Sequence, residues 1–223
     1  MKHTVVGFVV LTLVSACSAT PPPRIGCADV ERRLGDAVRA FELAGEALAV
    51  PGAATVDDVA VRLERLSLEC PAHAPTTVAL AAVVAGRDPA RAQTLLDRVF
   101  AVPGRHPDAA VLRARLAIDE GNLAFARRLL AGQVRLAPDH AGVHEAYAAA
   151  LYLSGRLDDA RDSLARARAL GAPPWRVAYH LGLVEEAAGR LGEAERAYTE
   201  AVALNPASSD AAARLKGLKA RVP

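Results

Sequence analysis

Residues 175–208 read WRVAYHLGLVEEAAGRLGEAERAYTEAVALNPAS, and this stretch decides the fold of the chain. It holds two short segments with apolar side chains at helical spacing, separated by Gly189 and ended by Pro206. A glycine takes positive φ without a steric penalty, so the chain can reverse after a helix, whereas a proline cannot continue the helical hydrogen-bond ladder. The stretch therefore predicts a hairpin of two helices.

The same marks recur at a fixed step of 34 residues towards the N-terminus. One mark is a small residue at the place where two helices cross, because a larger side chain would hold the backbones apart. It is occupied by Ala194, Ala160, Ala126 and Ala92. The turn glycine recurs as Gly189, Gly155 and Gly121, and a large apolar position as Tyr198, Leu164, Leu130 and Leu96. The chain therefore holds four repeats in register, at 73–106, 107–140, 141–174 and 175–208.

In the last repeat the marks are Leu181, Gly182, Gly189, Leu191, Ala194, Tyr198, Ala201, Leu204 and Pro206. This pattern resembles the tetratricopeptide repeat (TPR), a hairpin of two helices. The resemblance covers residues 73–208 and implies an all-α fold, a right-handed superhelical solenoid of TPR helix hairpins. A solenoid spreads its core along its length instead of forming one globule. The resemblance also implies a scaffold that binds other proteins, without naming the partner.

The N-terminus has the pattern of a secretory signal peptide, which we expect at residues 1–16. Lys2 precedes an apolar run, Val5–Val14, which is shorter than the ~20 residues of a membrane-spanning helix. The run leads into Val14-Ser15-Ala16-Cys17, which resembles the lipobox of bacterial lipoproteins. We therefore expect a lipid on Cys17. The alternative is an ordinary secreted protein that is cleaved nearby.

Residues 17–26 are expected to form a lipidated, proline-rich tether, because their three prolines favour an extended chain. Acyl chains on Cys17 would anchor the protein to a membrane. Ser18 is not the aspartate that usually retains bacterial lipoproteins in the inner membrane. The expected location is therefore the periplasmic face of the outer membrane, with a Gram-positive cell surface as the alternative.

Apolar periodicity predicts further helices on both sides of the repeats. Residues 27–72 are expected to form an N-terminal helical hairpin, with one helix from about Ala28 to Val50 and a second over Val56–Glu69. Thr55 is a suitable N-cap for the second helix. Residues 209–223 are expected to form a polar capping helix, which repeat arrays need to cover their last apolar face. Whether the N-terminal hairpin is a degenerate fifth repeat stays open.

Cys27 and Cys70 lie at the start of the first helix and the end of the second. If the two helices are antiparallel, the two thiols lie side by side. In an oxidising periplasm they would form a disulfide, and closing a loop of about 40 residues contributes ~3 to 4 kcal/mol in the chain-entropy model. The alternative is two buried free thiols.

No catalytic motif stands out in the sequence. It has no Gly-x-Ser-x-Gly, no phosphate-binding glycine loop and no Cys-x-x-Cys. His140 and His144 are spaced like two metal ligands on one helical turn, but no carboxylate motif accompanies them, so we expect solvated or turn histidines. We therefore expect a non-enzymatic protein with no catalytic residue, no cofactor and no metal. The alternative is a secreted enzyme with an unusual site.

The resemblance to TPR proteins implies a concave groove lined by the first helix of each repeat. The expected groove residues are Asp108, Val111, Arg115, Asp119, Glu145, Ala149, Tyr152, Arg176, Tyr179, His180, Leu183 and Glu186. Thr77 and Ala81 occupy the same positions in the first repeat. This set suits an extended or helical peptide, with tyrosines as anchors and arginines as carboxylate partners.

The expected function is a lipoprotein scaffold that binds an envelope protein and helps an envelope complex to assemble. Proteins of similar architecture include the pilotins of type IV pilus secretins and the TPR lipoproteins of tight-adherence pili. The alternative is an adaptor that recruits peptidoglycan hydrolases or proteases. Loss of Lys2 with the leader would lower the formal net charge from +2 to +1, which argues against nucleic acid because phosphate binding needs a concentrated basic face.

Overall fold

The chain is a row of antiparallel helix hairpins in the computed structural model, which describes residues 27–46 and 55–221. The signal peptide and tether predicted at residues 1–26 lie outside the described residues. Within the described residues there are eleven helices and no strands. They are α1 (Val30–Glu46), α2 (Val56–Glu69), α3 (Ala74–Val84), α4 (Pro89–Phe100), α5 (Pro107–Asp119), α6 (Leu123–Leu136), α7 (Ala141–Leu153), α8 (Leu157–Ala169), α9 (Pro174–Ala187), α10 (Leu191–Leu204) and α11 (Ser209–Lys219). The predicted all-α architecture is confirmed.

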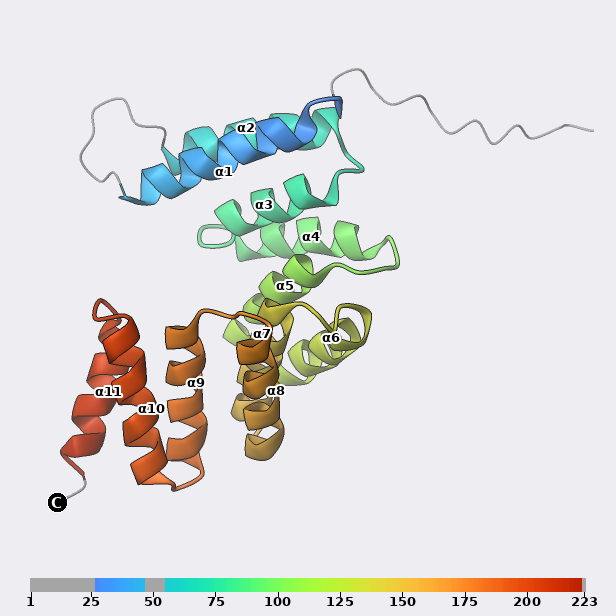
Figure 1. Cartoon of the computed structure of the whole chain (residues 1–223). Helices are drawn as coiled ribbons and strands as arrows, with labels where there is room; N and C mark the ends of the chain where they lie inside the picture. Colours follow the sequence, from blue (N-terminus) through green and yellow to red (C-terminus); the bar gives the residue numbers. More distant parts are fainter. Residues whose placement is uncertain (1–26, 47–54, 222–223) are drawn as a thin grey trace, which may run out of the picture.

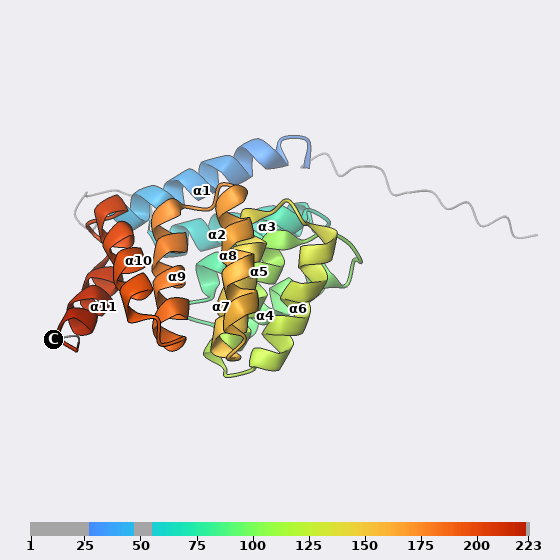
Figure 2. The ribbon, with the colours of Figure 1, turned by 60° about the horizontal axis from the view of Figure 1, so that its bottom comes forward.

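Each helix packs mainly against its neighbours in sequence, as expected for a solenoid. The first helices of successive hairpins also touch, because α5 contacts α3 and α7, and α7 contacts α9. Figure 1 shows the hairpins following one another from α1 and α2 at the top to α9, α10 and α11 at the lower left. Figure 2 shows the same order from a second direction, with α9 between the α7/α8 pair and the α10/α11 pair. The helices α3, α5, α7 and α9 thus form one continuous row.

The turn inside each of the last three hairpins depends on a glycine. Gly121, Gly155 and Gly189 have φ angles of 78°, 74° and 74°, which side chains with a β-carbon rarely adopt. The residue after each glycine donates its N–H to a carbonyl five residues back, for example Asn122 to Ala117 at 2.7 Å. This is the Schellman end of a helix, and it turns the chain sharply enough for the second helix to pack on the first.

The repeated alanines are the crossing points of the hairpins. Ala92, Ala126, Ala160 and Ala194 are each 0% exposed. The large apolar position beside them is also buried, with Leu96, Leu130, Leu164 and Tyr198 at most 1% exposed. Because the same two positions are filled in every hairpin, the four hairpins share one packing scheme.

In the last hairpin the large residue is an aromatic ring, and Gly182 makes room for it. A β-carbon at Gly182 would overlap the ring of Tyr198. The ring therefore packs directly against the α9 backbone, and the glycine is required by packing and not by its φ angle.

A buried carboxylate fixes the third hairpin against the fourth. Glu185 of α9 is 5% exposed, and its Oε1 lies 2.8 Å from Nε of Arg161 on α8. Arg190, in the turn after α9, forms a second ion pair with Glu185. A buried carboxylate needs such partners, since an unpaired one would lose its hydration without compensation. The two cations therefore hold α8, α9 and the following turn in one arrangement.

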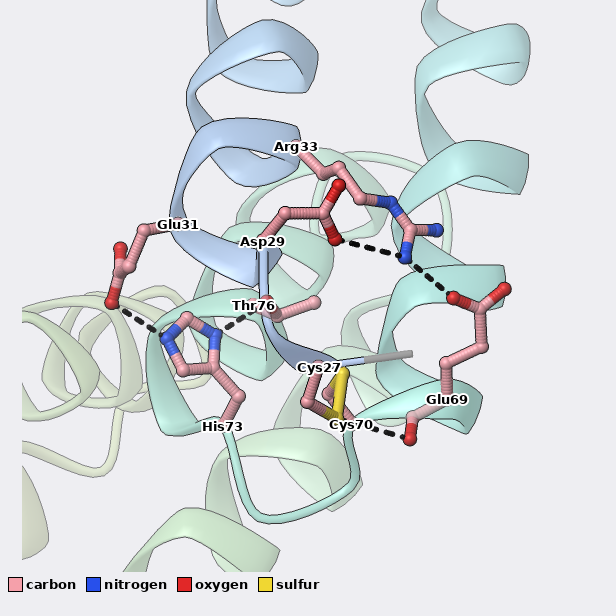
Figure 3. The surroundings of a disulfide bond; sticks show 8 residues. All are labelled: Cys27, Asp29, Glu31, Arg33, Glu69, Cys70, His73 and Thr76. Atoms are coloured by element: carbon pink, nitrogen blue, oxygen red, sulfur yellow. Dashed lines mark hydrogen bonds and ion pairs between the residues drawn. A yellow bond between two sulfur atoms is a disulfide. The ribbon is translucent and has the colours of Figure 1, made fainter. Parts of the chain in front are cut away.

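Cys27 and Cys70 are joined by a disulfide with an Sγ–Sγ distance of 2.11 Å and a Cα–Cα distance of 5.5 Å. Figure 3 shows that it links the start of α1 to the end of α2. Beside it, Nη1 of Arg33 donates to Glu69 Oε2 at 2.6 Å, a second link between the two helices. The N-terminal hairpin is thus closed covalently and by an ion pair at the same end.

His73 attaches α1 to the first repeat. Its Nε2 lies 2.9 Å from Glu31 Oε1 on α1, and its Nδ1 lies 2.7 Å from Thr76 Oγ1 on α3 (Figure 3).

Thr55 caps α2 through a capping box with Asp58. These hydrogen bonds hold the carboxyl group of Asp58 in its charged form and keep its pKa below the ordinary value. The end of the helix predicted to reach Val50 lies in residues 47–54, outside the described residues.

The C-terminal helix α11 packs on α10 and buries Ala211 and Leu218. Ser208 caps it by accepting a hydrogen bond of 3.4 Å from the Ala211 N–H. Its polar residues face outward, and Lys216 and Lys219 are exposed. No helix among the described residues combines the length and the apolar character that crossing a membrane requires.

Candidate functional site

A groove of about 390 Å³ lies along the row of first helices, between α5, α7 and α9. We call it the α5–α7–α9 groove. Its lining is formed by Val111, Ala114, Arg115, Ile118, Gly142, Glu145, Ala146, Ala149, Arg176 and His180. Most of the lining residues are glycine, alanine, valine or isoleucine. Each of the three helices also contributes one charged side chain, which is Arg115 on α5, Glu145 on α7 and Arg176 on α9.

Six of the residues predicted from the repeat pattern line this groove. They are Val111, Arg115, Glu145, Ala149, Arg176 and His180. They form three pairs spaced four residues apart, and this spacing places both members of a pair on the same face of one helix. Ala114, Ile118, Gly142 and Ala146 also line the groove and were not predicted. Ile118 continues the stripe of Val111 and Arg115 along α5, so helical periodicity was the signal that could have found it.

In the groove, an ion pair joins a buried carboxylate to a half-exposed arginine of the next repeat. Glu145 of α7 is only 6% exposed, and its Oε2 accepts a hydrogen bond of 2.6 Å from Nη2 of Arg176 on α9. His180 Nδ1 lies 3.5 Å from Glu145 Oε1 without forming a hydrogen bond. Arg176 retains an Nε atom that is buried and has no hydrogen-bond partner. The carboxylate thus holds Arg176 across the groove, with His180 beside it.

His180 favours its neutral form in this position. Burial lowers the pKa of its imidazole, the Glu145 carboxylate acts in the opposite direction, and the charge of Arg176 lowers the pKa further. With His180 neutral, the groove lining carries two arginines and one carboxylate, which is an excess of positive charge. This excess favours a ligand that carries carboxylates.

Arg115 is the freest of these cations. It is exposed on α5, and no ion pair joins it to any residue of 27–46 or 55–221. Its guanidinium presents five N–H donors in a planar fork, which matches the two oxygens of a carboxylate. Arg115 is therefore available to a ligand without breaking an existing contact.

A second, smaller hollow of about 160 Å³ adjoins the groove between α7, α8 and α9. Two more predicted residues, Tyr152 and Leu183, line it together with Ala149 and His180. Because Ala149 and His180 belong to both hollows, the two spaces are neighbours.

Two predicted groove residues, Tyr179 and Glu186, face the C-terminal end of the chain instead of the groove. The hydroxyl of Tyr198 donates to Glu186 Oε2 at 2.9 Å, and Arg221 Nη1 lies 2.9 Å from Glu186 Oε1. Tyr179 packs in the same cluster, with its ring centroid 6.1 Å from that of Tyr198. Burial, and then the Glu186 carboxylate, raises the pKa of the Tyr198 phenol far above its ordinary value. Tyr179 and Glu186 do not line the groove because α11 follows the last repeat in the place of another first helix, and α11 and the residues after it cover both side chains.

The remaining predicted residues are dispersed. Asp108 pairs with His140, whose Nε2 lies 3.3 Å from Asp108 Oδ1, and Asp119 is exposed at the end of α5. Thr77 and Ala81 are 7% and 0% exposed, so the expectation that they face the groove is wrong. They turn towards the core because they lie on the face of α3 that packs into the hairpin.

The two histidines spaced like metal ligands have structural roles. His140 caps α7, since its Nδ1 accepts a hydrogen bond of 3.2 Å from the Val143 N–H. His144 is 7% exposed and its Nε2 lies 3.0 Å from the Pro138 carbonyl oxygen, so the expectation of a solvated side chain is wrong for it. Within the described part of the chain, no three His, Cys, Asp or Glu residues are grouped as a metal would require.

A row of helix hairpins with glycine turns, alanine crossings and a hollow along the first helices defines the TPR fold. Comparison with solved structures supports this. TTC0263, a thermophilic TPR protein of Thermus thermophilus, aligns at a TM-score of 0.69 and 21% identity, over 86% of this chain and 99% of that one. The predicted solenoid of TPR hairpins is confirmed.

Two other structures share the fold. YrrB, described as a TPR protein with an unusual peptide-binding site, aligns at a TM-score of 0.56 and 13% identity, over 86% of this chain and 98% of that one. The Cut9–Hcn1 assembly aligns at a TM-score of 0.68 and 14% identity, over 88% of this chain and 39% of that one. No protein-family model and no curated protein matches the sequence.

Proposed function

We propose that this protein is a non-enzymatic scaffold that binds a segment of a partner protein in the α5–α7–α9 groove. The observation that carries the proposal is the pairing of a free cation, Arg115, with a floor of small side chains. Ala114, Gly142, Ala146 and Ala149 leave room for a peptide backbone to approach the helices closely. Arg115 and the exposed part of Arg176 then provide donors for carboxylates of the bound segment.

The groove also has features that make binding specific. Glu145 already holds Arg176 in one orientation, so less side-chain freedom is lost when a ligand binds. The description of YrrB as having a peptide-binding site supports the same use of the fold. Neither observation identifies the partner.

We further propose that the protein is an outer-membrane lipoprotein, anchored through Cys17 and facing the periplasm. The support is the leader pattern of residues 1–17 together with the Cys27–Cys70 disulfide, since disulfides persist in oxidising compartments. The partner would be an envelope protein, and the role would be to help a complex such as a pilus or secretion secretin to assemble. The alternative is an adaptor that recruits peptidoglycan hydrolases or proteases.

The experiment is a crosslinking pull-down from membranes with wild type, Arg115→Glu and Arg135→Glu. Arg135 is an exposed arginine on α6 and serves as the matched control for charge. We expect one envelope protein to be captured by wild type and by Arg135→Glu and to be lost with Arg115→Glu. Equal capture by all three proteins would contradict a role of the groove. A secretin subunit or a wall hydrolase as the captured protein would separate the two proposed roles.

A further inference from the structure

A third hollow lies nearer the N-terminus, between α1, α3 and α5. It measures about 560 Å³, and we call it the α1–α3–α5 groove. Its walls are mainly apolar, and the side chains that matter for the argument are Leu34, Val38, Val78, Ala79, Ala82 and Ala109. The helix α3, with sequence APTTVALAAVV, contains no charged residue at all. This groove therefore differs in chemistry from the α5–α7–α9 groove.

Part of this apolar surface is open to solvent. Val38 is 40% exposed, and Ala82 on α3 is also exposed. Single exposed apolar residues are common. These two line the same hollow, so one apolar side chain of a ligand would bury both of them.

The two grooves are joined by α5. Asp108 and Ala109 line the α1–α3–α5 groove, and Val111 and Arg115 line the α5–α7–α9 groove. Asp108, Val111 and Arg115 lie three and seven residues apart, which places them on one face of the helix. The distance from Asp108 to Arg115 along the helix axis is about 10 Å at 1.5 Å per residue. About three residues of an extended chain cover this distance.

The charges of the two grooves are unequally available. In the α1–α3–α5 groove, Arg105 forms an ion pair of 2.7 Å with Asp139, and Asp108 Oδ1 lies 3.3 Å from His140 Nε2. The hydrogen bond from Arg105 also holds the pKa of the Asp139 carboxyl below its ordinary value. Arg115, in contrast, has no ion pair with any described residue. A ligand that lies along both grooves therefore meets apolar side chains in the α1–α3–α5 groove and an available cation, Arg115, in the α5–α7–α9 groove.

We infer that both grooves bind one linear segment of a partner protein, with apolar side chains in the α1–α3–α5 groove and carboxylates at Arg115. This inference rests on the proposed function and adds the composition of the bound segment and the groove in which each part lies. Its apolar and acidic parts are separated by about three residues, the length of the passage along α5. The complementarity between the free cation and the acidic part determines which part of the segment lies at which groove.

The test uses a library of random 12-residue peptides displayed on phage and selected against the purified protein without its leader. Selection is repeated with Arg115→Glu, with Ala82→Arg, and with Arg135→Glu as the control. Ala82 and Arg115 are both exposed, so neither change disturbs the core. Val38→Thr is a milder second change in the apolar groove. Circular dichroism verifies that each variant is folded.

We expect the selected peptides to carry acidic residues at one end and apolar residues at the other, always in the same order after alignment. Arg115→Glu is expected to weaken a selected peptide about tenfold and to replace its acidic preference by a basic one. Ala82→Arg is expected to weaken the same peptide about tenfold while the acidic preference remains, and Val38→Thr to weaken it less. Arg135→Glu is expected to have no effect.

Two results would overturn the inference in different ways. In the first, Arg115→Glu weakens the binding of the selected peptides, whereas Ala82→Arg and Val38→Thr do not. This result would keep the α5–α7–α9 groove as a binding site and would show that the α1–α3–α5 groove takes no part in binding. Peptides that are unaffected by all the groove variants, or the absence of any enriched peptide, would remove the inference and the proposed function together.

Discussion

The hydroxyl of Tyr198 on α10 donates a hydrogen bond of 2.9 Å to Glu186 Oε2 on α9. The same carboxylate receives Arg221 at 2.9 Å and Arg214 at 3.6 Å, both from the C-terminal end of the chain. Glu186 thus joins the last repeat to its capping helix. Its side chain is 16% exposed, so these contacts are only partly screened by solvent.

Tyr198→Phe should lower the free energy of unfolding by about 1 to 2 kcal/mol, because it removes a hydrogen bond to a charged group and keeps the ring. Urea denaturation measures this. Tyr147→Phe is the control, since no hydrogen bond joins the Tyr147 hydroxyl to a described residue. An equal effect of both changes would show that the bond to Glu186 contributes nothing.

Gly182→Ala should destabilise the protein by about 1 to 3 kcal/mol, because the new β-carbon would overlap the ring of Tyr198 and force it aside. Gly132→Ala on α6 is the matched control. A β-carbon there meets no atom within 4 Å, so this change should stabilise the helix by about 0.5 to 1 kcal/mol. Thermal denaturation of both variants distinguishes them by the sign of the shift in midpoint. A stabilising Gly182→Ala would contradict the packing described here.

Stability should fall as the pH is lowered from about 7.5 to about 5.5, and His180 should account for part of the loss. Burial lowers the pKa of His180 in the folded protein, while in the unfolded chain an imidazole titrates near 6.5. Below that pH the unfolded chain binds a proton that the folded protein resists, so unfolding becomes more favourable. His180→Asn should lose less stability than wild type over this range in urea titrations. Identical losses would exclude His180 as a contributor.

Reduction of the Cys27–Cys70 disulfide should loosen the N-terminal hairpin alone. The two cysteines are 43 residues apart, and opening such a loop costs about 4 kcal/mol in the chain-entropy model. Because each hairpin contacts mainly its neighbours, hydrogen exchange should accelerate in α1 and α2 and stay unchanged in α9, α10 and α11. Cys27→Ser should reproduce the effect. Uniform acceleration along the chain would contradict a solenoid with local packing.

The hairpins could be predicted from the sequence because the backbone of each hairpin accepts only certain residue types at its turn and at its helix crossing. A positive φ demands Gly121, Gly155 and Gly189, and a close helix crossing demands an alanine such as Ala160. These requirements act within one hairpin, so they appear as a short pattern with a fixed step. The same reasoning located Thr55 as the cap of α2.

The groove could be predicted only in part because its residues depend on contacts between hairpins. Val111 and Arg115 line it as expected, since they face outward on a regular helix. The ion pair of Glu145 with Arg176 joins residues 31 positions apart, and no local pattern indicates it. Glu186 is covered because the C-terminal end of the chain folds back onto α9, and this depends on the packing of a helix outside the repeat.

The most direct test of the groove as the binding site is photocrosslinking in cells that produce the protein at its natural level. Benzoylphenylalanine is placed at position 119, which is exposed at the end of α5 one helical turn beyond Arg115, or at position 135 on α6, and crosslinked proteins are identified by mass spectrometry. We expect one partner protein to be linked at position 119, not at position 135, and to disappear when Arg115→Glu is added. Adducts at position 135 alone, or adducts at position 119 that persist with Arg115→Glu, would contradict the α5–α7–α9 groove as the binding site.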